Sequence, residues 1–563
     1  MVSPVLTKKQ ENTLTINDKT KKLFQVIYGD QVGSEDNKSQ RIQVSELISK
    51  MAFYYEKIRN SVDYKEEYLL RKNAIERILR RHILIEGVIK ISKSEEISKN
   101  LIIELIRAGY LPNNKLGEEK IEEVSSIIEK YIKLRNYSLS KISASSELKQ
   151  GNVMKARDNL HDKSEISNWL IAILSSEVEE SLGRKRAELV AVSNIYEILS
   201  KNIKLPSGLD YKDDLEIQIY LSIHRSFLKF DKKMLSFILF KYYNSEWNKA
   251  EDEDIAKISQ NIVDLYYTIQ KQLKHPLRKQ LNLIAKNYTV YYVVLIELIE
   301  EDPVKVYDNI KNDPKSFPRL IKNTCLKKYK NIKSKLWRSA MRSIVYIFLT
   351  KSIFVFLLEV PAIKFFGEEI NLLSLAINIT FPAFLLFIVV FFTKIPVDEN
   401  TAKIVEGIEE ITIKEKERKE PFILKKPSKR RGVMSVVFAF IYTITFFISF
   451  GTVVWALQKI NFTWVSIIIF LFFLAFVSFF GIRIRKGVKE FIIIKPKENI
   501  FSFLIDFFYV PIILSGKWLS EKFARVNVIV FILDFIIETP FKIIVEIAEE
   551  WTKYLRERKE DIS

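Results

Sequence analysis

Glycine, cysteine and histidine are all scarce in this chain of 563 residues. None of its 15 glycines stands in a GxGxxG or GxxxxGK arrangement, so phosphate-cradling loops are not visible. The one cysteine, Cys325, excludes an intramolecular disulfide framework and cysteine-rich metal sites. The four histidines show no HExxH spacing, and no GxSxG elbow is present. The sequence therefore predicts no cofactor, no metal and no catalytic residue, and it leans against an enzyme of familiar type.

The N-terminus also lacks an apolar core of signal-peptide length, so membrane insertion would have to be directed by internal segments. Such segments lie in the second half of the chain. A run of about 18 or more apolar residues is long enough to cross a hydrocarbon core. We expect spans at about residues 341–358, 371–393, 433–457 and 462–482, within a transmembrane region over residues 336–490. A hydrophilic loop, 394–432, separates the second and third spans.

The net charge of +19 gathers beside these spans. Because basic residues stay on the cytoplasmic side, the charge pattern predicts four crossings with both termini inside. Each basic residue near an anionic leaflet contributes about 1 kcal/mol, so these side chains are candidate lipid contacts. Nucleic acid is disfavoured as a partner, because interleaved aromatic residues with free access are missing beside a bilayer. The basic residues are Lys327, Lys328, Lys330, Lys333, Lys335, Arg338, Arg342, Lys429, Arg430, Arg431, Arg483, Arg485 and Lys486.

The first span is the weakest of the four because it contains Lys351. Its apolar residues contribute about 0.3 to 0.6 kcal/mol each, against a cost of about 3 for a lysine at mid-helix. Glu359, Asn378 and Thr380 complete a candidate intramembrane polar site. A rise of about 12 Å separates Lys351 from Glu359 along an α-helix, so we expect no direct pairing. The simpler interpretation is that Lys351 snorkels or pairs with Asn378.

The rest of the chain is predicted to be helical, which makes the fold class all-α. Residues 41–335 have helical periodicity without a fixed repeat, typical of a cytosolic bundle or an irregular solenoid. Residues 1–40 are expected to be a flexible polar tail that does not pack. Residues 491–563 are predicted to form amphipathic interfacial helices or to pack re-entrantly, because the apolar patches at 507–514 and 526–533 are too short to cross.

A few polar residues of the soluble half are possible core positions. His82 and His224 lie on apolar stripes, where a hydrogen-bonded core histidine is expected, whereas His161 is expected in a loop. Glu177 and Glu180 follow the apolar stripe that contains Trp169. A position at the edge of the surface is the expected one for both acids.

Three stretches, LWRSAMRSIVYIFLTKSIFVFLLEVP, INLLSLAINITFPAFLLF and GKWLSEKFARVNVIVFILDFIIETPFK, resemble an uncharacterised family of multi-pass membrane proteins from small-genome bacteria. The resemblance implies a bacterial cytoplasmic membrane as the location. It carries no activity with it.

Three functions remain open from the sequence. The leading hypothesis is a membrane scaffold that anchors a large partner-binding helical domain to the inner leaflet, with a protein partner and a possible homo-oligomer. The alternative is a transporter or channel subunit with an intramembrane site around Lys351 and Asn378. A membrane-bound enzyme acting on lipids is the third hypothesis, and it rests on location alone.

Overall fold

The chain divides into two compact units in a computed structural model, and each is described by itself. The structure describes residues 15–32, 41–44, 69–86, 93–147, 153–183, 186–313, 315–427, 432–494 and 500–525, together with scattered single positions. Gln25–Ala285, Glu420–Lys425 and Val528–Ser563 form what we call the helical unit. Met1–Phe24, Lys286–Lys419 and Lys426–Asn527 form the membrane unit.

The all-α prediction is confirmed. Among the described residues, strand is limited to a two-residue parallel pairing of β1 (Ile203–Lys204) with β2 (Phe422–Ile423), apart from isolated bridges. Within the described part of the chain, four helical segments are long and apolar enough to cross a membrane, which is consistent with a membrane protein. On the third of them, large side chains such as Phe447 and Val433 are exposed. Such a surface is stable in hydrocarbon and unfavourable in water.

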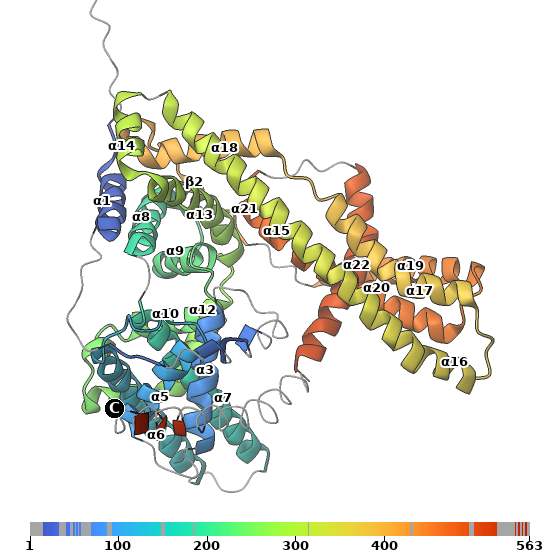
Figure 1. The fold of residues 1–563 in the computed structure, drawn as a ribbon, viewed down its shortest axis with the longest axis horizontal. Coiled ribbons are helices and arrows are strands. Elements are labelled where there is room, and N and C mark those ends of the chain that lie inside the picture. Colours follow the sequence, from blue (N-terminus) through green and yellow to red (C-terminus); the bar gives the residue numbers. More distant parts are fainter. Residues whose placement is uncertain are drawn as a thin grey trace, which may run out of the picture. The chain divides into compact units, whose positions relative to one another are not determined.

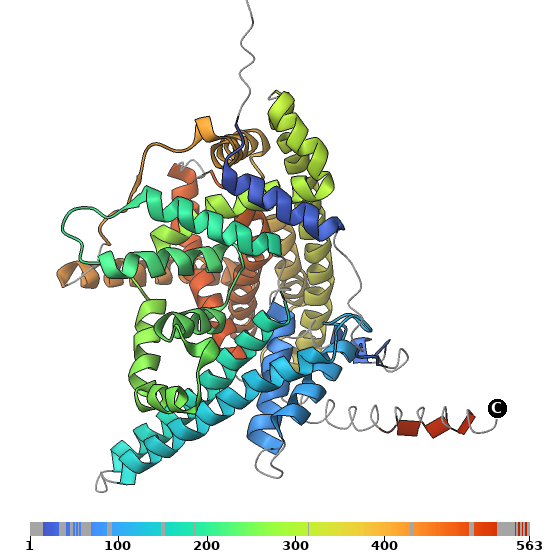
Figure 2. The same cartoon turned by 90° about the vertical axis from the view of Figure 1, so that its left-hand side faces the viewer.

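The helical unit is built on long helices that share one apolar core. Trp169, Leu101 and Phe240 are buried in it, and Trp247 packs its ring 5.0 Å from that of Tyr131. The longest helices, α6 and α7, lie side by side (Figure 2). The helices are α3 (Leu70–Arg80), η2 (Arg81–Glu86), α5 (Ser94–Arg107), α6 (Glu119–Glu147), α7 (Val153–Ser181), α8 (Arg186–Asn202), α9 (Lys212–Ser226), α10 (Lys232–Tyr243), η3 (Trp247–Lys249), α11 (Asp252–Gln260) and α12 (Ile262–Leu273).

Helix α15 (Ser316–Phe354) runs the length of the membrane unit (Figure 1). It continues without a break through the π-helical turn η4 (Val355–Glu359) into α16 (Val360–Phe365), a run of 50 residues. Helix α13 (Arg278–Glu301) links the two units along the chain. The other helices are α14 (Pro303–Asn312), α17 (Leu372–Phe391), α18 (Val397–Thr412), η5 (Lys414–Lys416), α19 (Val433–Lys459), α20 (Trp464–Ile484), α21 (Lys486–Phe491) and α22 (Ile500–Arg525).

The hydrophilic loop between the second and third spans is divided between the two units, and its longer part belongs to the membrane unit. Asn400 on α18 is fully buried, and its amide group donates to the Tyr329 hydroxyl (2.9 Å) and the Phe491 carbonyl (3.1 Å). Its Oδ1 accepts from the Ile493 backbone N–H at 2.8 Å. One side chain therefore joins α18, α15 and the segment that follows the fourth span. Within the helical unit, Gln280 Nε2 donates a hydrogen bond to the Lys425 carbonyl, and Gln280 Oε1 accepts one from the Lys425 backbone N–H.

The opening residues do pack, contrary to expectation. Helix α1 (Asp18–Val32) begins just after Asn17, whose side chain donates to the Ile411 carbonyl at 2.7 Å. Leu23 and Ile27 are buried. The polar composition of residues 1–40 concealed this short apolar stripe, which is enough to dock one helix. Residues 1–14 and 33–40 lie outside the described part of the chain.

The segment after the fourth span packs against the spans, one of the two arrangements expected for it. Pro511 and Gly516 do not interrupt it, because α22 continues through both and packs against α20 and α19. At Gly516, a Cβ atom would lie 1.9 Å from the carbonyl oxygen of Ala475, halfway along α20. Glycine thus allows backbone contact with the middle of a span, which favours packing within the bundle over the interfacial position. The patch at 526–533 and most of the closing helix after Phe541 lie outside the described residues.

Candidate functional site

Three of the four predicted intramembrane polar residues come together in the membrane unit. Lys351 comes from α15, Glu359 from η4 and Asn378 from α17, and all three side chains are fully buried. Asn378 Nδ2 donates to Glu359 Oε1 at 2.5 Å. The same helices contribute Val355 and Leu386 to buried apolar clusters. Burial in these low-dielectric surroundings strengthens the electrostatic interactions among them.

The expectation that Lys351 and Glu359 are too distant to interact is wrong. Lys351 Nζ lies 3.9 Å from Glu359 Oε2. The prediction counted the backbone rise and ignored the reach of two long side chains. In addition, η4 closes i→i+5 hydrogen bonds, which changes the helical phase of Glu359 relative to a regular α-helix.

Two members of the site were missed from the sequence, and both come from α20. Ser466 Oγ donates to Glu359 Oε1 at 2.7 Å. The ring centroid of Phe473 lies 4.0 Å from Lys351 Nζ, a cation–π distance. Serine and phenylalanine are ordinary residues in a membrane helix, so no local signal marked them.

Part of the site's hydrogen-bonding capacity is unused. Within the described residues, Lys351 Nζ, Glu359 Oε2 and Asn378 Oδ1 are buried without a hydrogen-bond partner. A buried polar atom that lacks a partner costs about 1 to 3 kcal/mol, and more if charged. Three such atoms in one place identify this cluster as the candidate site.

Thr380 does not belong to the cluster. Its side chain is exposed on α17, and its hydroxyl donates to the Ala376 carbonyl of the same helix at 2.8 Å. The prediction grouped it with Asn378 by proximity in sequence, but two residues along a helix turn the side chain to another face.

The basic residues beside the first span fall into two groups. Lys327 pairs with Glu301 at 2.9 Å, and Lys328 pairs with Glu297. The other five, Lys330, Lys333, Lys335, Arg338 and Arg342, are exposed on α15, and we call them the basic strip. Beyond the fourth span, Arg483 and Lys486 are exposed and Arg485 is half-buried, whereas Lys429, Arg430 and Arg431 lie outside the described residues.

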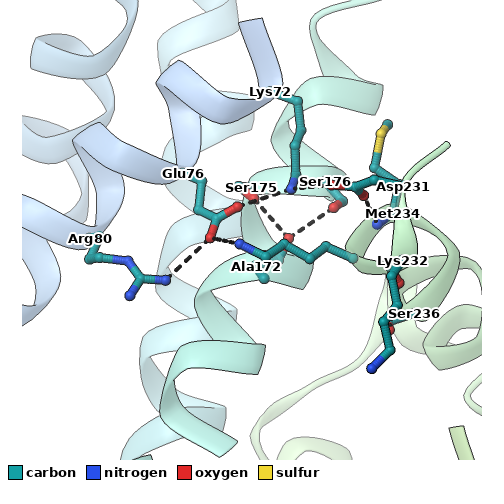
Figure 3. Close-up of polar contacts among 11 residues, drawn as sticks. Lys72, Glu76, Arg80, Ala172, Ser175, Ser176, Asp231, Lys232, Met234 and Ser236 are labelled. Carbon is teal, nitrogen blue, oxygen red and sulfur yellow. Dashed lines mark hydrogen bonds and ion pairs between the residues drawn. The ribbon is translucent and has the colours of Figure 1, made fainter. Parts of the chain in front are cut away.

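The helical unit holds a second buried charge cluster, which the sequence analysis overlooked (Figure 3). Fully buried Lys72 lies 2.9 Å from Glu76 and 3.3 Å from Asp231. Arg80 and Lys233 contact the other oxygen of Glu76. Burial raises the pKa of Glu76, but the charges of Lys72 and Lys233 outweigh it and lower that pKa to about 2. The i, i+4 spacing of residues 72, 76 and 80 was the available signal.

The surface position expected for Glu177 is wrong. Its carboxylate is buried and accepts hydrogen bonds from the Tyr131 hydroxyl at 2.7 Å and Trp247 Nε1 at 2.8 Å. Burial raises the pKa of this carboxyl group. Glu180 pairs with Lys241 at 2.9 Å. The aromatic donors come from other helices, so the sequence around Glu177 gave no sign of them.

The histidines do not gather. Both His82 and His224 are buried, and His224 Nδ1 lies 2.9 Å from the Tyr220 carbonyl oxygen. His161 lies within α7 and not in a loop. Among the residues that the structure describes, no group of three or more His, Cys, Asp or Glu side chains could hold a metal ion.

Comparison with known proteins adds no functional assignment. No family model, curated protein sequence or solved structure matches this chain. The function is therefore argued from the geometry alone.

Proposed function

We propose that this protein is an integral membrane scaffold that anchors a helical partner-binding unit to an anionic membrane surface. Four helices cross the bilayer, both termini face the cytoplasm of a bacterial cell, and the basic strip contacts the headgroups of the inner leaflet. The proposal is supported by the chemistry of each segment. Exposed apolar surface is suited to hydrocarbon, and exposed basic side chains beside it are suited to anionic lipid.

The observation that carries the proposal is the course of α15. Its first part packs in the protein, where Phe317 and Cys325 are buried. Its middle exposes the basic strip, and its last part is apolar and continues into η4 and α16. Because the helix is unbroken, protein contact, headgroup contact and bilayer crossing follow one another on a single element.

The helical unit supplies surface for a partner. Tyr242 and Tyr267 are each 52% exposed, and Leu189 is 51% exposed. Aromatic side chains are enriched at protein interfaces relative to the rest of the surface. Glu76 is paired with basic side chains and Glu177 is hydrogen-bonded inside this unit, which suits a structural role.

The lipid contact is tested by removing charge from the basic strip. We expect K330Q/K333Q/K335Q to weaken the preference for anionic over zwitterionic lipid by up to about 100-fold, since each lysine contributes about 1 kcal/mol. The measurement is the lipid composition that co-purifies from mixed nanodiscs, at low and high salt. The matched control is K212Q/K249Q/K274Q, which removes three exposed lysines of the helical unit.

Equal lipid preference in the two triple variants would contradict the proposed contact. Purified protein that catalyses turnover without a partner would contradict the scaffold role itself.

A second candidate function, a transporter or channel subunit, is favoured by the unpartnered atoms around Lys351. Ionisable groups inside a bilayer often mark ion and substrate pathways. Here we expect ion flux through proteoliposomes that K351L abolishes. Flux that is absent, or indifferent to that substitution, would remove this candidate.

A further inference from the structure

The unpartnered atoms of the intramembrane cluster have a definite hydrogen-bonding pattern. Lys351 Nζ is a donor only, whereas Glu359 Oε2 and Asn378 Oδ1 are acceptors. The two atoms of the ion pair are 3.9 Å apart, beyond direct hydrogen-bonding distance. A ligand that satisfies all three atoms must accept one hydrogen bond and donate two.

Charge decides which class of ligand fits. The Lys351 ammonium repels a metal cation, and the Glu359 carboxylate repels an anion. The ligand must therefore be neutral, small and able both to donate and to accept. Water has two donor hydrogens and two acceptor lone pairs, and buried waters typically make about three hydrogen bonds to such groups.

We propose that Lys351, Glu359 and Asn378 form an intramembrane binding site for one water molecule, through which the lysine–glutamate pair exchanges protons. The water accepts from Lys351 Nζ and donates to Glu359 Oε2 and Asn378 Oδ1. This inference requires that α15, α17 and α20 cross the bilayer, as the proposed function does. It does not depend on the scaffold role.

The proton step is balanced within the site. A Lys351 N–H bond breaks as that proton passes to the water, and one water proton passes to Glu359 Oε2, where an O–H bond forms. The products are a neutral amine, a neutral carboxylic acid and an unchanged water molecule. The net charge of the pair is zero before and after this step. Throughout this step, Glu359 Oε1 keeps the hydrogen bonds that it accepts from Asn378 Nδ2 and Ser466 Oγ.

Few other charges act on the pair. Helix α17 contains no charged residue, and the only charged residue of α20 is Arg483 near its far end. Lys364 lies on α16, five residues beyond Glu359. Ser466, the third residue of α20, places Glu359 near the end of the bundle that the charge pattern assigns to the outside.

Infrared difference spectroscopy of the full-length protein in nanodiscs tests the site directly. We expect the band of a protonated carboxyl group, which shifts in deuterated water and disappears in E359Q. A water band that shifts in oxygen-18 water should disappear with it. N378L should weaken the water band while the carboxyl band remains.

Two further variants serve as controls for misfolding. K351M/E359Q removes both charges and should fold, yet it should lack the carboxyl and water bands. T380V alters a polar residue of α17 that lies outside the cluster, and it should leave both bands unchanged. Absence of the carboxyl band or of the water band from the unaltered protein, or loss of the bands in T380V, would overturn the inference. None of these outcomes bears on the anionic-lipid preference, which tests the scaffold proposal separately.

Discussion

At the scale of single residues, the molecule buries two lysines in opposite ways. Lys72 has two acidic partners within 3.3 Å, so its charge is compensated inside the helical unit. Lys351 has an aromatic ring at 4.0 Å and an acid at 3.9 Å, and its nitrogen makes no hydrogen bond among the described residues. The first arrangement is typical of a buried ion pair with a structural role. The second leaves hydrogen-bonding atoms that a ligand could satisfy.

The Glu76 cluster makes the stability of the helical unit depend on pH. The pKa of Glu76 is about 2 in the fold, against an ordinary value of 4.5. A carboxyl group with a lowered pKa stabilises the fold above pH 4.5, and this contribution is lost as the pH falls toward 2. The contribution is at most about 3 kcal/mol, and it is reduced because burial also lowers the pKa of Lys233.

We expect E76Q to destabilise the protein at neutral pH and to flatten its stability between pH 4.5 and 2. The pH dependence of stability is measured by chemical unfolding, with hydrogen exchange of α3 and α7 as the readout. E246Q, at an exposed acid of the same unit, is the control and should keep the pH dependence of the unaltered protein. An E76Q variant with an unchanged pH profile would show that this carboxylate does not stabilise the unit.

At the scale of elements, the contact between α20 and α22 depends on one glycine. A Cβ at Gly516 would meet the carbonyl of Ala475 at 1.9 Å and the Phe479 Cβ at 3.0 Å. Small residues at such positions let membrane helices approach closely, which replaces the hydrophobic driving force that is absent in lipid.

We expect G516A to push the two helices apart and to destabilise the membrane unit by about 1 to 3 kcal/mol, the usual cost of overpacking. Thermal unfolding in nanodiscs measures the loss. G451A on α19 is a matched control, since no atom lies within 4 Å of its added Cβ. That variant should be neutral or slightly stabilised, because alanine favours helix by about 1 kcal/mol. Equal effects of the two substitutions would contradict close packing at Gly516.

At the scale of the whole molecule, the charge pattern fixes the expected orientation in the membrane. Lys330 and Arg485 should share the cytoplasmic side, and Asn461, in the turn between α19 and α20, should lie outside. Cysteine scanning suits this chain because Cys325 is its only cysteine and is buried.

In a C325S background, we expect Asn461→Cys to react with a membrane-impermeant maleimide on intact cells. Lys330→Cys and Arg485→Cys should react only after permeabilisation. Labelling of residues 330 and 485 from opposite sides would exclude four crossings between cytoplasmic termini.

The sequence was informative where one local property decides the structure. Hydrophobic length located the apolar helices, and helical periodicity gave the fold class. The sequence contains no indication of contacts between residues that are distant in the chain. Ser466 and Phe473 complete the site around Lys351 from another helix, Trp247 supplies a donor to Glu177, and Asn400 joins three segments. None of these contacts has a local pattern, because each depends on tertiary packing.

The unbroken course of α15 through η4 into α16 has a mechanical consequence. A helix is stiff along its axis and in torsion, so a twist applied where Tyr329 meets Asn400 is transmitted along the rod to Lys351. The π-helical turn at Val355–Glu359 departs from the regular α-helical hydrogen-bonding pattern of that rod, and Glu359 lies at its end. Torque from a partner on the cytoplasmic side would thus change the spacing of the buried ion pair before it reached the far loop.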